Sequence, residues 1–67
     1  MIELSVNNEK HQMQEGSTVD NLLETFGFEQ GKIAVAINTE FVPRSHYAIQ
    51  ALSNGDSIDI LAAVQGG

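Results

Sequence analysis

Hydrophobic and polar residues alternate in the first part of the chain. Residues 2–6 place apolar side chains at every second position, which is the period of a strand buried on one face. Asn7-Asn8 follows, and asparagine tolerates a positive φ, so a tight turn is expected there. The alternation resumes over residues 10–14. These two segments predict an N-terminal β-hairpin.

The next apolar positions have the spacing of a helix. Over residues 19–26 they fall at i, i+3, i+4 and i+7, which makes one apolar stripe on a short amphipathic helix. Ser17 and Thr18 are both good N-cap residues, and a polar residue three positions later completes an approximate capping box. Gly27 follows, at the place where a helix often ends in a left-handed residue. The pattern therefore predicts a helix over residues 19–26.

After the helix the pattern returns to that of strands. Residues 33–37 are an apolar run with large β-branched side chains at alternate positions, which indicates a central strand. Asn38-Thr39 can turn the chain, so that residues 40–42 pair back before Pro43. We therefore expect a second hairpin in the middle of the chain.

The last third of the chain has one clear strand. Residues 45–52 have weak periodicity and predict one helical or 3₁₀ turn. Residues 54–56, with the sequence Asn-Gly-Asp, carry a strong turn signal. Residues 58–64 are the last predicted strand, and only three residues follow it.

The predicted order of elements is strand, strand, helix, strand, strand, turn, strand. This order suggests a mixed sheet of about five strands packed on one helix. It is the α+β architecture called the β-grasp, the shape of ubiquitin. We expect the domain to cover residues 1–64 and residues 65–67 to form a flexible tail. The expected core consists of Ile2, Leu4, Val6, Val19, Leu22, Leu23, Phe26, Ile33, Val35, Ile37, Ile58 and Ile60.

A single helix covers only one face of such a sheet, so the other face is open. Strand alternation places Ala34 and Ala36 there, together with Asp59, Leu61 and Ala63 of the last strand. Small side chains leave this surface flat, and Leu61 would be a raised apolar contact beside the tail. We interpret it as a protein-docking patch centred on Leu61. The alternative is a set of scattered surface apolar residues, which are normal.

The charge of the chain bears on its partners. Its 67 residues, room for one domain, carry three basic and nine acidic side chains and a net charge of −6. Such a chain repels nucleic acid and anionic membranes and suits a partner with a basic docking surface, unless the charge serves solubility alone. No apolar run approaches the ~20 residues of a membrane helix, and the first residues are unlike a secretory signal. We expect a cytoplasmic protein.

The residues that could carry chemistry do not form a recognisable site. The chain has no cysteine, which excludes a disulfide, a thiolate metal site and a cysteine-bound iron–sulfur cluster. His11 and His46 are far apart and lack the spacing of metal ligands. The serines and glycines form neither a nucleophile elbow nor a phosphate loop. We therefore expect no catalytic residue, no bound metal or other cofactor, and no enzyme activity.

The sequence ends in Gly66-Gly67, which arises by chance in about 0.5% of chains. Residues 64–67 can extend about 13 Å, and two residues without Cβ atoms can enter a narrow channel. The terminal carboxylate, ionised at neutral pH, could attack the α-phosphate of ATP in a partner enzyme. A sulfur nucleophile could then replace the adenylate, and the activating enzyme would hold the magnesium. The alternative is a frayed end without function.

Several short segments, spread over essentially the whole chain, together carry a family resemblance. They are Thr18-Val19 with Leu22-Leu23, Ala36-Ile37-Asn38, Val42-Pro43-Arg44, Tyr47, Gly55-Asp56 with Ile58 and Ile60, and Ala63-Val64-Gln65-Gly66-Gly67. With them the chain resembles the sulfur carrier proteins of thiamine biosynthesis, which feed the thiazole ring. The Val-Pro-Arg segment combined with the final Gly-Gly is fairly specific. Tyr47 departs from relatives that often have tryptophan, which leaves the tail chemistry unaffected.

The resemblance implies a sulfur transfer carried out with partner enzymes. An adenylyltransferase of the ubiquitin-E1-like type would adenylate Gly67 with ATP and magnesium. A cysteine desulfurase or another sulfur donor would then leave a Gly67 thiocarboxylate. Thiazole synthase would accept this sulfur. The residues expected to contact partners are Leu61, Ala63, Val64, Gln65 and Gly66.

Other functions stay open on these residues. The carrier subunit of molybdopterin synthase has the same fold and tail chemistry, although the Val-Pro-Arg segment argues against it. A ubiquitin-like modifier would join Gly67 to a lysine through an isopeptide bond. A non-covalent β-grasp adaptor would have an inert tail. Val42-Pro43-Arg44 is assigned either to the fold or to docking.

Overall fold

The computed structural model describes residues 1–62. In chain order the elements are β1 (Ile2–Val6), β2 (Glu9–Met13), α1 (Val19–Phe26), the 3₁₀ helix η1 (Gln30–Lys32), β3 (Ile33–Ile37), β4 (Glu40–Val42), the 3₁₀ helix η2 (Arg44–His46) and β5 (Ser57–Ala62). The predicted bounds of the helix are confirmed. The last predicted strand is found as β5 up to Ala62, and the predicted domain boundary after residue 64 lies outside the described residues.

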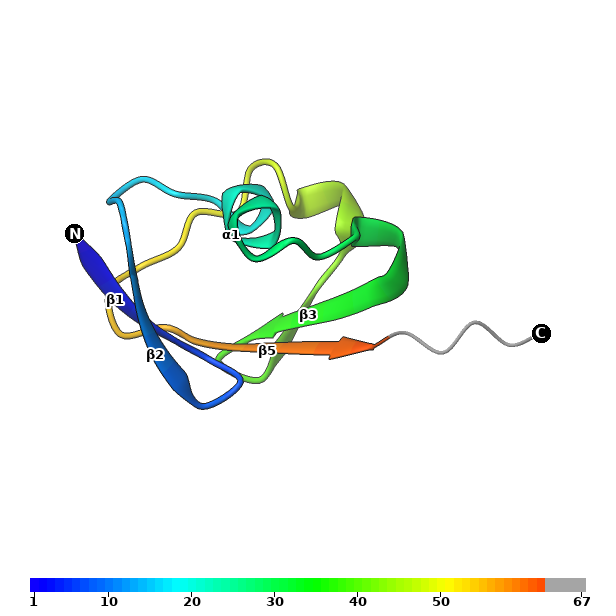
Figure 1. Cartoon of the computed structure of the whole chain (residues 1–67). Coiled ribbons are helices and arrows are strands. Elements are labelled where there is room, and N and C mark those ends of the chain that lie inside the picture. Colours follow the sequence, from blue (N-terminus) through cyan, green and yellow to red (C-terminus); the bar gives the residue numbers. More distant parts are fainter. Residues whose placement is uncertain (63–67) are drawn as a thin grey trace.

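The strands of residues 1–62 form one five-stranded sheet in the order β2-β1-β5-β3-β4. β1 and β5 are parallel, and the other neighbouring strands are antiparallel. Helix α1 crosses one face of this sheet (Figure 1). The last strand thus lies in the middle of the sheet, between β1 and β3. This arrangement confirms the predicted mixed sheet on one helix.

Both hairpins turn through residues with positive φ. Asn7 and Asn8 have φ values of 49° and 69°, and Asn38 and Thr39 have φ values of 50° and 72°. Positive φ at both central positions is the type I′ turn, whose twist matches that of the flanking strands. Asparagine adopts this conformation readily, whereas the β-branched Thr39 is uncommon in it.

Helix α1 has defined ends. The Thr18 hydroxyl accepts a hydrogen bond from the N–H of Asn21 at 3.3 Å, and the Asn21 side chain accepts one from the N–H of Thr18 at 2.9 Å. This reciprocal pair is the capping box, and it selects Thr18 rather than Ser17 as the N-cap. Gly27 ends the helix in the left-handed region with a φ of 78°.

The core lies between α1 and the sheet. Of the predicted core residues, Phe26 and Ile33 are only partly buried and pack against its edge, and the others are buried. Val42 joins the core because it pairs with the buried Val35. Further members, which the predicted core did not include, are Met13, Tyr47 and Leu52.

The two hairpin turns also hold β5. The Asn7 side chain accepts a hydrogen bond from the N–H of Ile60 at 2.8 Å, beyond the last residue that pairs β5 with β1. The Asn38 side chain accepts one from the N–H of Ser57 at 2.9 Å. These two amides add to the ladders on either side of β5, so the strand that leads to the C-terminal residues is positioned firmly.

Candidate functional site

The face of the sheet opposite α1 carries a continuous apolar surface. In the strand register Ala34 lies opposite Leu61, and Ala36 lies opposite Phe41. Leu61 is 62% exposed and Phe41 is 69% exposed. Directly opposed residues on one face have Cβ atoms about 4.5–5.5 Å apart, so two large side chains flank a floor of two alanines. We call Ala34, Ala36, Phe41 and Leu61 the apolar open face.

The structure confirms the predicted placement of Leu61 with Ala34, Ala36 and Asp59 on this face. Phe41 was not predicted as part of it. Phe41 and Val42 are adjacent and both apolar, so strand alternation shows that they point to opposite faces but not which of them is buried. The three-residue strand β4 was too short to show which of its faces is buried until its register with β3 was known.

The other half of this face is polar. Strands β1 and β2 contribute the pairs Glu3–Gln12 and Ser5–Lys10. Asp59 of β5 lies between the two halves and is half-buried, with Ala36 opposite it. The face therefore changes from polar over β1 and β2 to apolar over β3, β4 and the end of β5.

The predicted tail residues lie beyond the part of the chain that the structure describes. Strand β5 carries Leu61 and is described up to Ala62. Outside the described residues lie Ala63, Val64, Gln65, Gly66 and Gly67. Leu61 of the apolar open face thus comes shortly before the segment of the chain on which the predicted chemistry depends.

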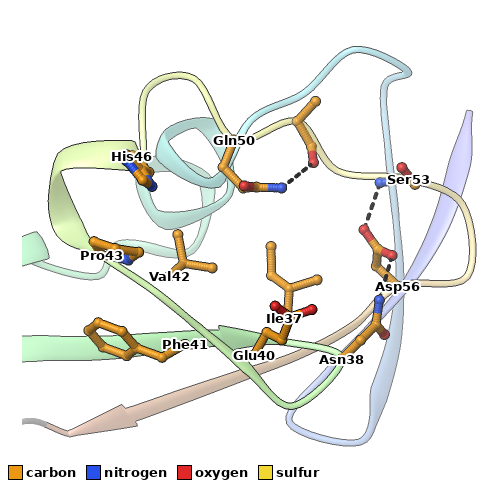
Figure 2. A pocket seen from close by; sticks show the side chains of 11 residues that line it. Ile37, Asn38, Glu40, Phe41, Val42, Pro43, His46, Gln50, Ser53 and Asp56 are labelled. Atoms are coloured by element: carbon orange, nitrogen blue, oxygen red, sulfur yellow. Dashed lines mark hydrogen bonds between the residues drawn. The ribbon is translucent and has the colours of Figure 1, made fainter.

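A pocket of about 320 Å³ lies between β4, Phe41 included, and the segment that contains η2 (Figure 2). The buried side chains of Ile37 and Val42 line it, together with the exposed Glu40 and His46. The carboxylate of Asp56, also at the pocket, accepts hydrogen bonds from the Asn38 side chain at 3.0 Å and the Ser53 N–H at 2.8 Å (Figure 2). Asp56 therefore ties the second hairpin to the loop before β5.

The Val42-Pro43-Arg44 segment contributes to the fold through its first residue, because Val42 is 6% exposed and belongs to the core. Pro43 and Arg44 have exposed side chains. A Cβ atom added to Gly31 would lie 3.5 Å from Nη1 of Arg44, so the guanidinium packs against that glycine. The carbonyl of Arg44 accepts a hydrogen bond from the N–H of Tyr47 at 3.1 Å.

No group of three or more His, Cys, Asp or Glu side chains within residues 1–62 could hold a metal ion. His11 lies 3.8 Å from a carboxylate oxygen of Glu9 and meets the ring of Phe26 edge-on, with 4.8 Å between ring centroids. Burial raises the pKa of Tyr47, while the positive charge of Arg44 and a backbone hydrogen bond with Val35 partly oppose this rise. In the described part of the chain, no helix has the length and apolar character needed to span a membrane.

Comparison with known proteins identifies the family. The ThiS family model matches residues 1–67. The chain belongs to the ThiS family. It is 33% identical over 66 residues to the sulfur carrier protein ThiS of Escherichia coli (strain K12), and the match covers 98% of this chain and 100% of that protein. A crystal structure of a thiamine biosynthesis protein (ThiS) from Geobacter metallireducens superposes with a TM-score of 0.85 at 25% identity, over 98% of this chain and 100% of that one.

Two longer proteins also contain a segment similar to this ThiS family chain. A thiazole synthase of Paramagnetospirillum magneticum is 38% identical over 66 residues, and one of Magnetococcus marinus is 32% identical over 66 residues. Each match covers 98% of this chain but only 20% of the relative, so the chain spans a fifth of the length of these two curated relatives.

Proposed function

We propose that this chain is a sulfur carrier of thiamine biosynthesis and that its reactive group is the carboxylate of Gly67. One observation carries the proposal: the chain matches the ThiS family model over residues 1–67 and a named sulfur carrier over that protein's full length. A β-grasp domain that presents its C-terminal segment from the central strand β5 suits this role, because the rigid domain can dock while the segment reaches a partner's active site.

In the proposed reaction an E1-like adenylyltransferase binds ATP and magnesium. An oxygen of the Gly67 carboxylate attacks the α-phosphate and releases pyrophosphate. This step gives an acyl adenylate, in which AMP is a good leaving group. A persulfide sulfur supplied by a cysteine desulfurase then displaces AMP and gives an acyl disulfide. A thiol reduces the S–S bond of this acyl disulfide and releases the thiocarboxylate. A donor of hydrosulfide would instead displace AMP and give the thiocarboxylate directly. The chain acts as a co-substrate of cytoplasmic enzymes and binds neither ATP nor metal by itself.

The acceptor in this proposal is thiazole synthase. Two relatives with that name contain a segment similar to 98% of this chain, which supports a functional link between carrier and synthase. We propose that the apolar open face docks on the partner enzymes, with Leu61 at its centre and with Ala63, Val64, Gln65 and Gly66 entering the partner's channel. The net charge of −6 suits enzymes whose docking surfaces are basic.

The intact mass of the chain tests the proposal. The purified chain is incubated with ATP, magnesium, the activating enzyme and a desulfurase with cysteine. We expect its mass to rise by the difference between sulfur and oxygen, and we expect no rise without ATP or after deletion of Gly67. Addition of thiazole synthase and its substrates should return the mass to that of the carboxylate.

Other outcomes would contradict the proposal. If the activating enzyme thiolates a second, known carrier but never changes the mass of this chain, the tail is inert and the chain is an adaptor. If the chain instead appears in covalent conjugates with lysine side chains, it is a modifier. If its sulfur passes only to molybdopterin synthase, the pathway is wrong while the carrier chemistry stands.

A further inference from the structure

Asp59 is a carboxylate without an ion-pair or hydrogen-bond partner among residues 1–62. The ion pairs found in this part of the chain join His11 to Glu9 and Lys32 to Glu29. Asp59 is half-buried in β5, with Ala36 opposite it and the exposed Leu61 two residues further on the same face. A protein that covers the apolar open face must therefore also remove water from this charge. That removal is unfavourable unless a cation of the covering protein takes the place of the water.

Phe41 lies on the other side of the same alanine. Ala36 is the register partner of Phe41 on β4 and of Asp59 on β5. Neighbouring strands are about 4.8 Å apart, so the Cα atoms of Phe41 and Asp59 are about 10 Å apart across this row. The side chain between them is a single methyl group. An exposed ring and a carboxylate thus lie on either side of Ala36. We call the position over Ala36, between these two groups, the slot.

The chemistry of the slot favours one cationic side chain. A guanidinium is planar, stacks on aromatic rings and donates paired N–H groups to a carboxylate. A lysine ammonium is a compact and strongly hydrated charge that does not use the ring in the same way. We propose that the protein which docks on this face places an arginine over Ala36, stacked on Phe41 and hydrogen-bonded to Asp59. This inference rests on the proposed function, because the docking protein is an enzyme that acts on the tail.

The test measures the affinity of the full chain for the activating enzyme and for thiazole synthase by isothermal titration calorimetry. Asp59→Asn removes the charge and keeps the shape, and we expect at least about tenfold weaker binding to one of the two enzymes. Phe41→Leu keeps an apolar contact but removes the ring face, and we expect about threefold or greater weakening. In the double variant the affinity should fall by a smaller factor than the product of the factors for the two single variants, because one arginine makes both contacts.

Glu3→Gln is the matched control, since it makes the same change of charge on the polar half of the same face, over β1. Its affinity should stay within about twofold of the wild type, because exposed charges at the rim of an interface contribute little. Circular dichroism of each variant checks that the fold is retained. Ala36→Leu, which fills the slot, should weaken binding to the same enzyme as Asp59→Asn does.

Several results would overturn the proposed arginine contact. If Asp59→Asn binds both enzymes with an affinity within twofold of that of the wild type, the carboxylate does not contact the docking protein. An unchanged affinity of Phe41→Leu beside a weakened Asp59→Asn excludes the stacked arginine. The gain of sulfur by the wild-type chain separates the two proposals: if sulfur is gained while Asp59→Asn binds normally, the slot is wrong and the carrier function stands. If the wild type gains no sulfur and binds neither enzyme, both proposals fail.

Discussion

Phe41 and Leu61 lie on one face of the sheet although their strands, β4 and β5, do not pair with each other. Both strands pair with β3, where Ala36 and Ala34 lie opposite the two large side chains. Either residue alone would be an ordinary exposed apolar side chain. Together with the alanines between them they form one apolar surface beside the end of β5, which is the kind of surface that marks a protein-binding site.

Leu61→Asp tests the role of this surface. The side chain is exposed, so we expect the free energy of unfolding to change by no more than about 0.5 kcal/mol. Binding to the activating enzyme or to thiazole synthase should weaken by about tenfold or more, because the new carboxylate would be buried against apolar groups. Calorimetric titration gives the affinity, and urea unfolding gives the stability.

Ile49→Asp is the control for this prediction. Ile49 is 75% exposed and lies between η2 and β5 in the chain, outside the strands of the open face. The same chemical change there should leave the affinity within about twofold, as surface changes outside an interface usually do. Unaltered binding of Leu61→Asp to both enzymes would remove the docking role of Leu61.

Leu22→Ala should bring the fold close to unfolding. Leu22 has no exposed surface and lies on the side of α1 that faces the sheet. Truncation of such a buried leucine costs about 2–5 kcal/mol. A domain of this size has a net stability of only about 3–5 kcal/mol. We therefore expect the urea unfolding curve of Leu22→Ala, monitored by circular dichroism, to lack a native baseline. Ile49→Ala should unfold like the wild type.

Thr39→Gly should stabilise the second hairpin. Thr39 has a φ of 72°, and a left-handed conformation costs a residue with a side chain about 1–2 kcal/mol. Glycine avoids this cost but loses more conformational freedom on folding, so the expected net gain is about 0.5–1 kcal/mol. Thermal unfolding measures this gain as a higher Tm.

Asn38→Gly is the matched substitution in the same turn, and we expect it to lower the Tm. Asn38 also has a positive φ, but its side chain bonds to the N–H of Ser57 and to the carboxylate of Asp56. The loss of these hydrogen bonds should destabilise the fold by more than the removal of the backbone strain stabilises it. A lower Tm for Thr39→Gly than for the wild type would show that Thr39 is not strained.

Stability should fall at high pH because of Tyr47. Burial raises the pKa of this phenol above its ordinary value of 10.0. In the unfolded chain the phenol therefore ionises first, so its contribution to stability is complete below pH 10 and is lost as the pH rises through the higher folded-state pKa. Tyr47→Phe has no proton to lose. Its urea midpoint should decline less between pH 9 and pH 12 than that of the wild type, and parallel declines would contradict this account.

The sequence by itself determined the local elements. The bounds of α1, both hairpin turns and most of the core follow from spacing and turn residues, because a helix or a tight turn is specified by residues close together in the chain. The same alternation placed Leu61, Ala34 and Ala36 on the open face. It did not assign Phe41, since a three-residue strand has too few positions to reveal its buried side.

Tertiary structure decided what depends on strands finding one another. The parallel pairing of β1 with β5 places the first and the last strand of the described chain side by side in the middle of the sheet. The register with β3 sets Phe41 and Asp59 on either side of Ala36, and packing under α1 buries Tyr47 from a segment without periodicity. A strand has two edges that can each accept a neighbour. Which strand pairs with which edge is therefore settled only when all the strands bury their apolar faces under α1.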